Sequence, residues 1–420
     1  MSHRVVIVGG GFGGLYAAKG LAHAPVELTL VDRHNYHLFQ PLLYQVATGA
    51  LSPGEIASPL RHVLSRNRNT RVWLAEVTDI DVDARELILG ELKLPYDTLV
   101  LAAGAGNHYF GHDRWQADAP GLKSIEDATE IRSRILRAFE SAEMETDPET
   151  RREWLTFVLI GGGPTGVELA GAMSEIANDT LRHDFRSINP AESHILLLEG
   201  GPRILPTFPP QLSEAAERSL TRMGVHTRTK TMVTGIDPTG VTVLVDGATH
   251  RIPTRTIVWS AGVAPSPLGA ILARRIGVAP DRAGRVVVEP DLSVPGHPEI
   301  LVIGDMANFS HQDGKPLPGV APVAMQQGRY VASLIQKRLR GEPVEPFHYW
   351  NKGNLATIGR RSAVADFGAI RFSGPIAWLG WLFVHLMYLV GFENRVLVLI
   401  KWAYNYVTHN RGARLITGGP

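Results

Sequence analysis

The sequence predicts an α/β protein with two doubly wound domains, followed by a C-terminal amphipathic region. A β-branched run, a glycine-rich turn and an apolar helical pattern follow one another from Val5, and the same order returns from Trp154. A late stretch, 375–392, is eighteen residues long and has no acid, lysine or arginine. A chain of 420 residues is long enough for two or three domains.

The composition excludes several classes of protein. The formal net charge is +1 and no run of five like charges occurs, so we expect no nucleic-acid partner. The absence of cysteine excludes disulfides, cysteine-ligated iron–sulfur clusters and dithiol redox chemistry. The sixteen histidines show no metal-ligand spacing, so we expect no metal site. The apolar run at the N-terminus reads as a strand and turn rather than a signal peptide, which favours a cytoplasmic location.

The first glycine turn has the G-x-G-x-x-G spacing at Gly9, Gly11 and Gly14. The first glycine allows a tight turn, the second lets the backbone approach a pyrophosphate, and the third lets the helix pack closely on the strand. The phosphates then meet the positive end of the helix. The next predicted strand, 26–31, is followed by Asp32, which can accept hydrogen bonds from a ribose. The pattern predicts a Rossmann-like dinucleotide site.

A second turn repeats this spacing at Gly161, Gly163 and Gly166, and its second strand, 194–198, is followed by Glu199. The alternative is a glycine turn that binds nothing, but both copies have the strand, the helix and the acid in the expected order. A carboxylate repels a 2′-phosphate, so Glu199 favours NADH over NADPH. The nearby Arg203 could accommodate that phosphate, which argues against a preference for NADH.

Two dinucleotide sites in one chain resemble the flavoprotein pyridine-nucleotide oxidoreductases, in which the first site holds FAD and the inserted one holds the nicotinamide cofactor. Segment 96–104 resembles the strand and turn that close the first domain, and 299–305 resembles the late FAD motif, whose aspartate binds the ribityl chain. The alternative for Asp305 is a turn residue after a buried strand. The resemblance implies FAD contacts at Gly9, Gly11, Phe12, Gly13, Gly14, Asp32, Arg33, Gln40, Ala103, Gly104, Gly304, Asp305 and Ala324. It implies contacts with NADH, the substrate, at Gly161, Gly163, Pro164, Thr165, Gly166, Glu168, Glu199 and Gly262.

Segment 32–48, DRHNYHLFQPLLYQVAT, looks like the type II NADH dehydrogenases, single-chain enzymes that pass electrons from NADH to membrane quinone. Segments 196–205, 256–263 and 318–328 extend the resemblance over nearly the whole length. The last is similar to the quinone-side A-Q-x-A-x-Q pattern, with Pro322 in place of the first glutamine. Gln326 and Gln327 would then serve the quinone, and the alternative for both is helix capping or flavin packing.

The resemblance implies two catalytic residues, Glu168 and Gln326. Glu168 resembles an acid near flavin and nicotinamide and would position the nicotinamide or guide a proton. We expect it in the first turn of its helix, where the dipole favours a carboxylate. Lys352 would lie at the quinone mouth; the alternative is a solvated loop lysine.

The implied function is a non-proton-pumping NADH:quinone oxidoreductase of a respiratory chain, in which hydride passes from NADH to FAD and two electrons then pass to a membrane quinone. One alternative is a soluble flavoprotein reductase of a protein acceptor. The other is a flavin-based redox sensor that binds NADH without turnover.

The closing stretch, 375–392, could span a bilayer, lie on one, or fill a core. Eighteen helical residues rise about 27 Å, close to the roughly 30 Å of hydrocarbon. Positive residues flank it on both sides, and 396–407 is amphipathic, with Lys401 and Asn405 on its polar face. We therefore expect two helices lying in one leaflet. Five aromatic residues would favour the headgroup level: Trp378, Trp381, Trp402, Tyr404 and Tyr406. The alternative is a dimer core or a cover for the FAD domain.

The predicted domains are an FAD-binding domain at 1–115 and 285–345, an NADH-binding domain at 150–270, and a membrane-anchoring or dimerisation region at 346–420. We expect a homodimer that is peripheral, or monotopic, at the cytoplasmic face of the cell (or thylakoid) membrane. Its expected partners are a membrane quinone and the lipid bilayer surface.

Overall fold

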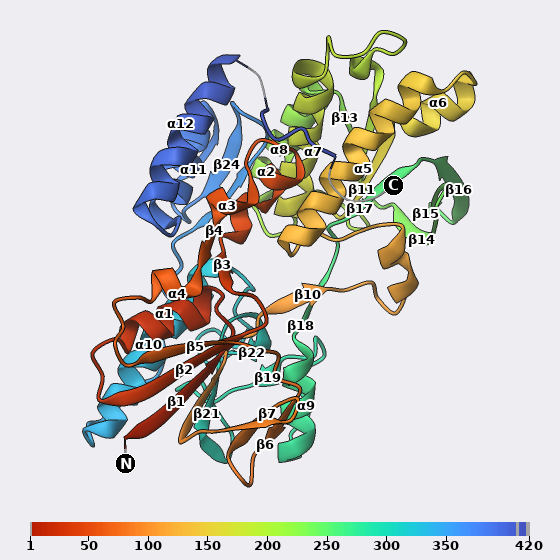
Figure 1. The fold of residues 1–420 in the computed structure, drawn as a ribbon. Helices are drawn as coiled ribbons and strands as arrows, with labels where there is room; N and C mark the ends of the chain where they lie inside the picture. Colours follow the sequence, from red (N-terminus) through yellow and green to blue (C-terminus); the bar gives the residue numbers. More distant parts are fainter. Residues whose placement is uncertain (1, 409–410, 417–420) are drawn as a thin grey trace. The chain divides into compact units, whose positions relative to one another are not determined.

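The computed structural model describes residues 2–408 and 411–416, which form two compact units (Figure 1). The first unit contains Met1–Leu38, Ala57–Gly106 and Val263–Lys352, and the second contains Phe39–Ile56, Asn107–Gly262 and Gly353–Pro420. Each unit is therefore assembled from three separate stretches of the chain. The bounds of the three functional domains expected from the sequence remain predictions.

A six-stranded sheet forms the centre of the first unit, in the order β20-β21-β9-β1-β2-β5. All neighbours for which pairing is given are parallel except β20 with β21. Strands β1 and β9 contain continuous runs of Val, Ile and Leu because both of their faces are buried there. The strands are β1 (His3–Val8), β2 (Val26–Asp32), β5 (Thr70–Leu74), β9 (Thr98–Leu101), β20 (Ser293–Val294) and β21 (His297–Val302).

Two helices of the first unit, α1 (Phe12–Gly20) and α10 (Ala321–Leu339), pack closely because glycines face each other. A Cβ on Gly328 would lie 2.3 Å from the carbonyl oxygen of Gly13, so no larger residue fits there. The smaller elements of this unit are β3 (Tyr36–Leu38), β4 (Ala57–Pro59), α4 (Leu60–Val63), β6 (Asp79–Asp81), β7 (Glu86–Leu89), β8 (Leu92–Pro95), β10 (Ala105–Asn107), β18 (Val263–Pro265), α9 (Pro267–Ile276), β19 (Val286–Val287), η5 (Gly304–Met306) and β22 (Ala307–Asn308).

A four-stranded parallel sheet, β13-β12-β11-β17, forms the centre of the second unit. A three-stranded antiparallel sheet packs on one of its faces through a shared apolar cluster that includes Val158, Leu196 and Val243. The four strands are β11 (Thr156–Ile160), β12 (His194–Leu198), β13 (Val225–Arg228) and β17 (Thr256–Trp259), and the covering strands are β14 (Met232–Asp237), β15 (Gly240–Val245) and β16 (Ala248–Pro253).

Proline marks the start of several helices of the second unit, because its fixed φ suits the first helical position and its missing N–H is not needed there. Helix α5 begins instead with a capping box at Ser124. The helices are η1 (Gln40–Leu42), α2 (Leu43–Ala47), α3 (Pro53–Ile56), η2 (Asp113–Ala117), α5 (Ile125–Met144), α6 (Pro148–Trp154), α7 (Pro164–Glu175), the π-turn η3 (Ile176–Thr180), η4 (Pro190–Glu192) and α8 (Pro210–Arg222).

The C-terminal part of the second unit is a three-stranded meander followed by two helices that lie side by side (Figure 1). The strands are β23 (Asn354–Thr357), β24 (Ala363–Asp366) and β25 (Arg371–Gly374), and the helices are α11 (Pro375–Tyr388) and α12 (Phe392–Thr408). The closing stretch is therefore a helix of fourteen residues and a loop. The chain turns at Gly391, where φ is 89°. No helix among the described residues is long and apolar enough to cross a membrane.

The aromatic residues of α11 and α12 do not all lie where the sequence predicts. Trp381 is buried, at 2% exposed, and the half-buried Trp402 donates its indole N–H to Gln45 Oε1 at 2.7 Å. The headgroup position expected for Trp381 is therefore wrong, because its side chain is buried inside the second unit. Tyr404 and Tyr406 are exposed, as an interfacial position requires.

Candidate functional site

The first glycine turn leaves space in front of α1. Gly9 has φ 106°, and a Cβ there would lie 2.4 Å from the carbonyl oxygen of Ala102. A Cβ on Gly14 would lie only 1.8 Å from the carbonyl oxygen of Gly9, so both positions require glycine. Around Gly11 nothing among the described residues lies within 4 Å of a Cβ, and no side chain caps the helix. The N–H groups of the first helical turn can therefore meet a phosphate.

Asp32 closes this turn with both carboxylate oxygens. Its Oδ2 accepts the backbone N–H of Gly10 at 2.6 Å, and its Oδ1 accepts that of His34 at 2.7 Å. A carboxylate offers about four lone-pair sites, so each oxygen can accept a further bond, for example from a ribose hydroxyl. The neighbouring Arg33 is exposed.

A buried histidine beside the turn is a candidate that sequence patterns did not single out. His37 is 1% exposed, and its Nδ1 lies 2.9 Å from the carbonyl oxygen of Gly10. A carbonyl only accepts, so Nδ1 carries the proton and Nε2 is an acceptor without a partner among the described residues. Burial lowers the pKa of His37 to about 4, so the ring is neutral at pH 7. The available signal was the alternation in β3, which places His37 on its buried side.

The late motif forms a second glycine turn in the same unit. Gly304 has φ 71°, and its N–H donates to Gln327 Oε1 at 2.7 Å. Gln327 is 1% exposed. A Cβ on Gly304 would lie 3.5 Å from Ala324, and one on Gly319 would lie 3.2 Å from Asp305 Oδ1. The structure thus brings Gly304, Asp305, Ala324 and Gln327 together.

The other residues assigned to FAD or quinone are distributed over both units. A Cβ on Gly9 would lie 3.0 Å from Ala103 N, so Ala103 and Gly104 adjoin the first turn. Gln326 exchanges two 3.0 Å hydrogen bonds with the peptide groups of Trp350, and the exposed Lys352 follows two residues later. Gln40 lies in the second unit and donates its amide N–H to the carbonyl of Lys123 at 3.2 Å.

The second glycine turn repeats the geometry of the first. Gly161 has φ 110°, and a Cβ on Gly166 would lie 1.9 Å from the carbonyl oxygen of Gly161. Around Gly163 nothing among the described residues lies within 4 Å of a Cβ. Glu199 accepts the backbone N–H groups of Gly162 at 2.7 Å and Gly201 at 2.6 Å. The two turns therefore use their acids in the same way.

The exposure or contacts of four more residues near the second turn are defined: Pro164, Thr165, Gly262 and Arg203. Pro164 is the first residue of α7 and is exposed, and Thr165 is half-buried beside it. Gly262 has φ 77°, and a Cβ there would lie 2.7 Å from the Phe110 ring, so its glycine is required by chain packing. Arg203 donates to the carbonyls of Phe208 at 2.9 Å and Pro206 at 2.8 Å. Its guanidinium is thus engaged by the backbone.

Glu168 lies in the second turn of α7, since that helix begins at Pro164 and has no acid in its first turn. The expected first-turn position, with its dipole interaction, is therefore wrong. The residue keeps some exposed surface, but its surroundings are dense enough that desolvation raises its pKa to about 8. A hydrogen bond from the backbone of Thr357 opposes this shift. The carboxyl of Glu168 is therefore protonated in most molecules at pH 7.

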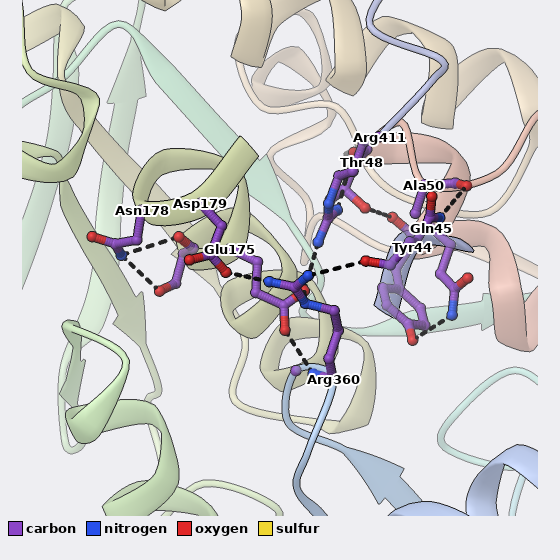
Figure 2. Close-up of polar contacts among 12 residues, drawn as sticks. Tyr44, Gln45, Thr48, Ala50, Glu175, Asn178, Asp179, Arg360 and Arg411 are labelled. Carbon is purple, nitrogen blue, oxygen red and sulfur yellow. Dashed lines mark hydrogen bonds and ion pairs between the residues drawn. The ribbon is translucent and has the colours of Figure 1, made fainter. Parts of the chain in front are cut away.

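A buried polar cluster lies seven residues further along the same helix (Figure 2). Glu175 accepts Arg411 Nη2 at 2.7 Å and the backbone N–H of Arg360 at 2.6 Å. Gln45 Nε2 donates to the hydroxyl of the buried Tyr44 at 2.9 Å. Burial first, and then the charge of Glu168, raises the pKa of Tyr44 well above its usual range.

Sequence patterns did not predict this cluster. The one available signal was the spacing of Glu168 and Glu175, which are seven residues apart and therefore share a helix face. The partners of Glu175 lie more than 180 residues further along the chain, so no local pattern could name them.

Comparison with known proteins agrees with this geometry. The family model described as pyridine nucleotide-disulphide oxidoreductase matches residues 3–328, and the NDH2 C-terminal domain model matches 351–409. The type II NADH:quinone oxidoreductase Ndh of Mycobacterium tuberculosis is 49% identical over 99% of this chain and 90% of its own length. The chain belongs to the pyridine nucleotide-disulphide oxidoreductases, in the type II NADH:quinone oxidoreductase family.

A second curated relative and a solved structure are also similar to this type II family member. Demethylphylloquinone reductase NdbB of Synechocystis is 30% identical, over 95% of each chain. The structure of NDH2 from Plasmodium falciparum in complex with NADH superimposes with a TM-score of 0.89 over 100% of both chains, at 21% identity. The predicted family resemblance and the α/β fold class with two Rossmann-like domains are thus confirmed.

Proposed function

We propose that this protein is a non-proton-pumping NADH:quinone oxidoreductase, which moves a hydride from NADH to FAD and then two electrons to a quinone. The observation that carries this is the pair of glycine turns, each closed by an acid that accepts a backbone N–H of the turn, from Gly10 in the first and Gly162 in the second. Both turns lie on one chain that aligns almost end to end with a type II NADH:quinone oxidoreductase.

The first turn and the late motif fit FAD. A Cβ at Gly9 or Gly14 would collide with backbone, whereas the space around Gly11 is open, as a bound pyrophosphate requires. Asp32 would accept hydrogen bonds from the adenosine ribose, and Asp305 would hold the ribityl chain. Bound FAD supplies the redox chemistry, in which a hydride is accepted and two electrons are passed on.

The second turn suits NADH. Glu199 keeps lone pairs for two ribose hydroxyls after accepting two backbone N–H groups. Its charge would repel a 2′-phosphate, and Arg203, the cation that could offset this, donates to backbone carbonyls. We therefore propose that NADH is preferred to NADPH.

Glu168 would supply or hold a proton. With a pKa of about 8, its carboxyl is mostly protonated at pH 7 and can be deprotonated by a stronger base. Reduction of a quinone to a quinol takes up two protons, and a protonated acid in the enzyme would supply one of them. Positioning of the nicotinamide through the same carboxyl is the other role we propose for it.

The quinone would meet the first unit near Gln326. The amide of Gln326 is held by two bonds to the backbone of Trp350, so its orientation is set before a substrate arrives. Trp350 is 74% exposed and Lys352 is exposed two residues away. We propose that this exposed edge of the first unit receives the quinone ring, with Gln327 supporting Gly304 behind it.

Helices α11 and α12 would lie on a lipid surface. They expose large apolar side chains although their polar residues Lys401 and Asn405 bond within the unit. The exposed residues are Ile376, Leu379, Phe383, Met387, Val396, Leu397, Leu399, Ile400, Tyr404, Tyr406 and Val407. Exposed apolar side chains on two adjacent helices mark an interaction or membrane surface. We propose a peripheral position at the cytoplasmic face of the membrane, and a homodimer.

A steady-state assay tests the reaction. Purified, FAD-loaded protein is supplied with NADH or NADPH, each against ubiquinone, menaquinone and plastoquinone analogues. We expect rapid NADH oxidation only when a quinone is present. Turnover with NADPH alone, or with a protein acceptor in the absence of quinone, would overturn the proposal. Flavin reduction without reoxidation by any quinone would instead favour a redox sensor.

A further inference from the structure

A small cavity in the second unit lies where the C-terminal residues meet two helices. It is bounded by the end of α2, by one face of α5, by η3 and by the chain after α12. We call it the Arg132 cavity. Its lining residues are Ala47, Thr48, Gly49, Arg132, Ile135, Leu136, Ile176, Thr180, Arg411, Ala413 and Arg414.

The charge around the Arg132 cavity is of one sign. Three arginines line it, and no aspartate or glutamate is among its described lining residues. Arg411 is paired with Glu175 at 2.7 Å and also donates to the carbonyl of Thr48 at 3.0 Å (Figure 2). Arg414 is paired with Asp184. Two of the three positive charges are therefore balanced from outside the cavity.

Arg132 is not balanced by any described residue. It is 7% exposed, and its Nε has no hydrogen-bond partner in the described part of the chain. Desolvation lowers the pKa of Arg132, with no carboxylate opposing the shift, yet a guanidinium stays protonated in proteins. A buried charge without a counter-charge is strongly destabilising. A ligand of opposite charge would remove this cost.

The space allows only a small ligand. The cavity admits about one sphere of the size of a water molecule, which excludes phosphate, sulfate and any nucleotide. A water molecule would fill the space but would not neutralise the guanidinium. A halide ion is only slightly larger than a water molecule and carries the charge that the guanidinium requires.

We propose that the Arg132 cavity binds one chloride-sized anion, held chiefly by Arg132 between α5, the end of α2 and the C-terminal residues. The N–H of Ala413 donates to the carbonyl of Gly49 at 3.2 Å, so chain 411–414 already closes this side of the cavity. The anion thus joins the C-terminal residues to the segment that carries Tyr44 and Gln45. This inference does not depend on the proposed reaction.

Thermal unfolding of the FAD-loaded protein in chloride and in gluconate, at equal ionic strength, tests the proposal. Gluconate is too large for the cavity. We expect chloride and bromide to raise the unfolding midpoint by roughly 2 °C over gluconate at ten times the dissociation constant. In Arg132→Met this difference should vanish, and in gluconate the variant should be at least as stable as the wild type because an unpaired buried charge is gone.

The matched control is Arg134→Met, on the same helix but outside the cavity. Arg134 pairs with Glu130 and donates to the carbonyls of Ala117 and Asp118, so its loss lowers stability and leaves the chloride increment unchanged. Equal midpoints in chloride and gluconate for the wild type, or an increment that survives in Arg132→Met, would overturn the proposal. A crystal grown in bromide gives an independent readout: anomalous density at Arg132 is expected, and its absence means that water fills the cavity.

Discussion

Each acid that closes a glycine turn already has two backbone donors, so its orientation is set before any nucleotide binds. Asp32 and Glu199 hold the N–H of Gly10 and of Gly162 in the same way. A carboxylate fixed in this manner offers its remaining lone pairs in defined directions. It therefore binds a ligand more tightly than a freely rotating side chain would.

Replacing Glu199 by glutamine should weaken the choice between the two nicotinamide cofactors. The amide keeps the shape of the side chain but loses the charge that repels a 2′-phosphate. We expect kcat/KM for NADH to fall about tenfold, and the ratio of NADH to NADPH efficiency to fall at least as far. Steady-state kinetics with both cofactors at a saturating quinone concentration measure this. A ratio equal to that of the wild type would show that Glu199 does not meet the ribose.

Replacing Glu168 by glutamine should change the pH profile. In the wild type, loss of the Glu168 proton near pH 8 should produce an alkaline fall in kcat. In Glu168→Gln we expect kcat with quinone to fall by about 10²-fold and the alkaline fall to disappear. Rates from pH 5 to pH 10 measure this, and an unchanged alkaline limb in the variant would assign it to another group.

The same carboxyl should make stability depend on pH. Its folded pKa of about 8 lies above the ordinary value of 4.5, so the fold favours the protonated form. The corresponding stability is fully present below about pH 4.5 and is lost as the pH rises through 8. The unfolding midpoint of the wild type should therefore fall relative to Glu168→Gln between these values. Parallel curves would contradict the raised pKa.

At the scale of elements, the polar face of α12 turns inward. Lys401 pairs with Glu55 at 2.6 Å, Trp402 bonds Gln45, and Asn405 donates to the carbonyl of Ala50 at 3.2 Å. These contacts tie α12 to residues 45–55, because the polar residues recur on one side of the helix. The amphipathic pattern was visible in the sequence, but not that its polar side meets protein instead of water.

Trp402→Phe should show how much the hydrogen bond between Trp402 and Gln45 contributes to stability. The phenyl ring keeps the apolar contact and removes the N–H that Gln45 Oε1 accepts. We expect a loss of about 1–2 kcal/mol in unfolding free energy, since a buried amide oxygen is left without its donor. Denaturant unfolding measures it. The control is Trp378→Phe, because Trp378 stacks on Tyr406 and its N–H bonds no described residue. Equal losses of unfolding free energy in both variants would show that the effect comes from ring packing and not from the hydrogen bond.

At the scale of the whole molecule, removing the C-terminal helices would be a poor test of membrane binding. Their loss would also remove Trp402 and Arg411, which support Gln45 and the buried Glu175. Changes confined to exposed side chains separate the two effects. We expect Phe383→Glu and Val407→Glu each to lower binding to lipid vesicles about tenfold, because each places a charge where about 2 kcal/mol of apolar burial is expected.

NADH oxidation with a soluble quinone analogue should be unchanged in both variants. The control for vesicle binding is Met144→Glu, at an exposed apolar residue of α5 outside α11 and α12. Vesicle flotation measures the partition. Unchanged partition in Phe383→Glu and Val407→Glu, together with loss of a dimer in sedimentation, would assign the exposed face of α11 and α12 to a second subunit.

The two glycine turns and the acids that close them follow from local sequence, because a strand, a tight turn and a helix N-terminus are made by neighbouring residues. Local segments of at most seventeen residues also indicated the family. Tertiary contacts set the surroundings of Glu175, the pairing of Gln326 with Trp350, and the direction of the polar face of α12. These depend on burial and on partners from distant parts of the chain. Local patterns carry no information about such partners, whereas the free energy of a buried charge depends on them almost entirely.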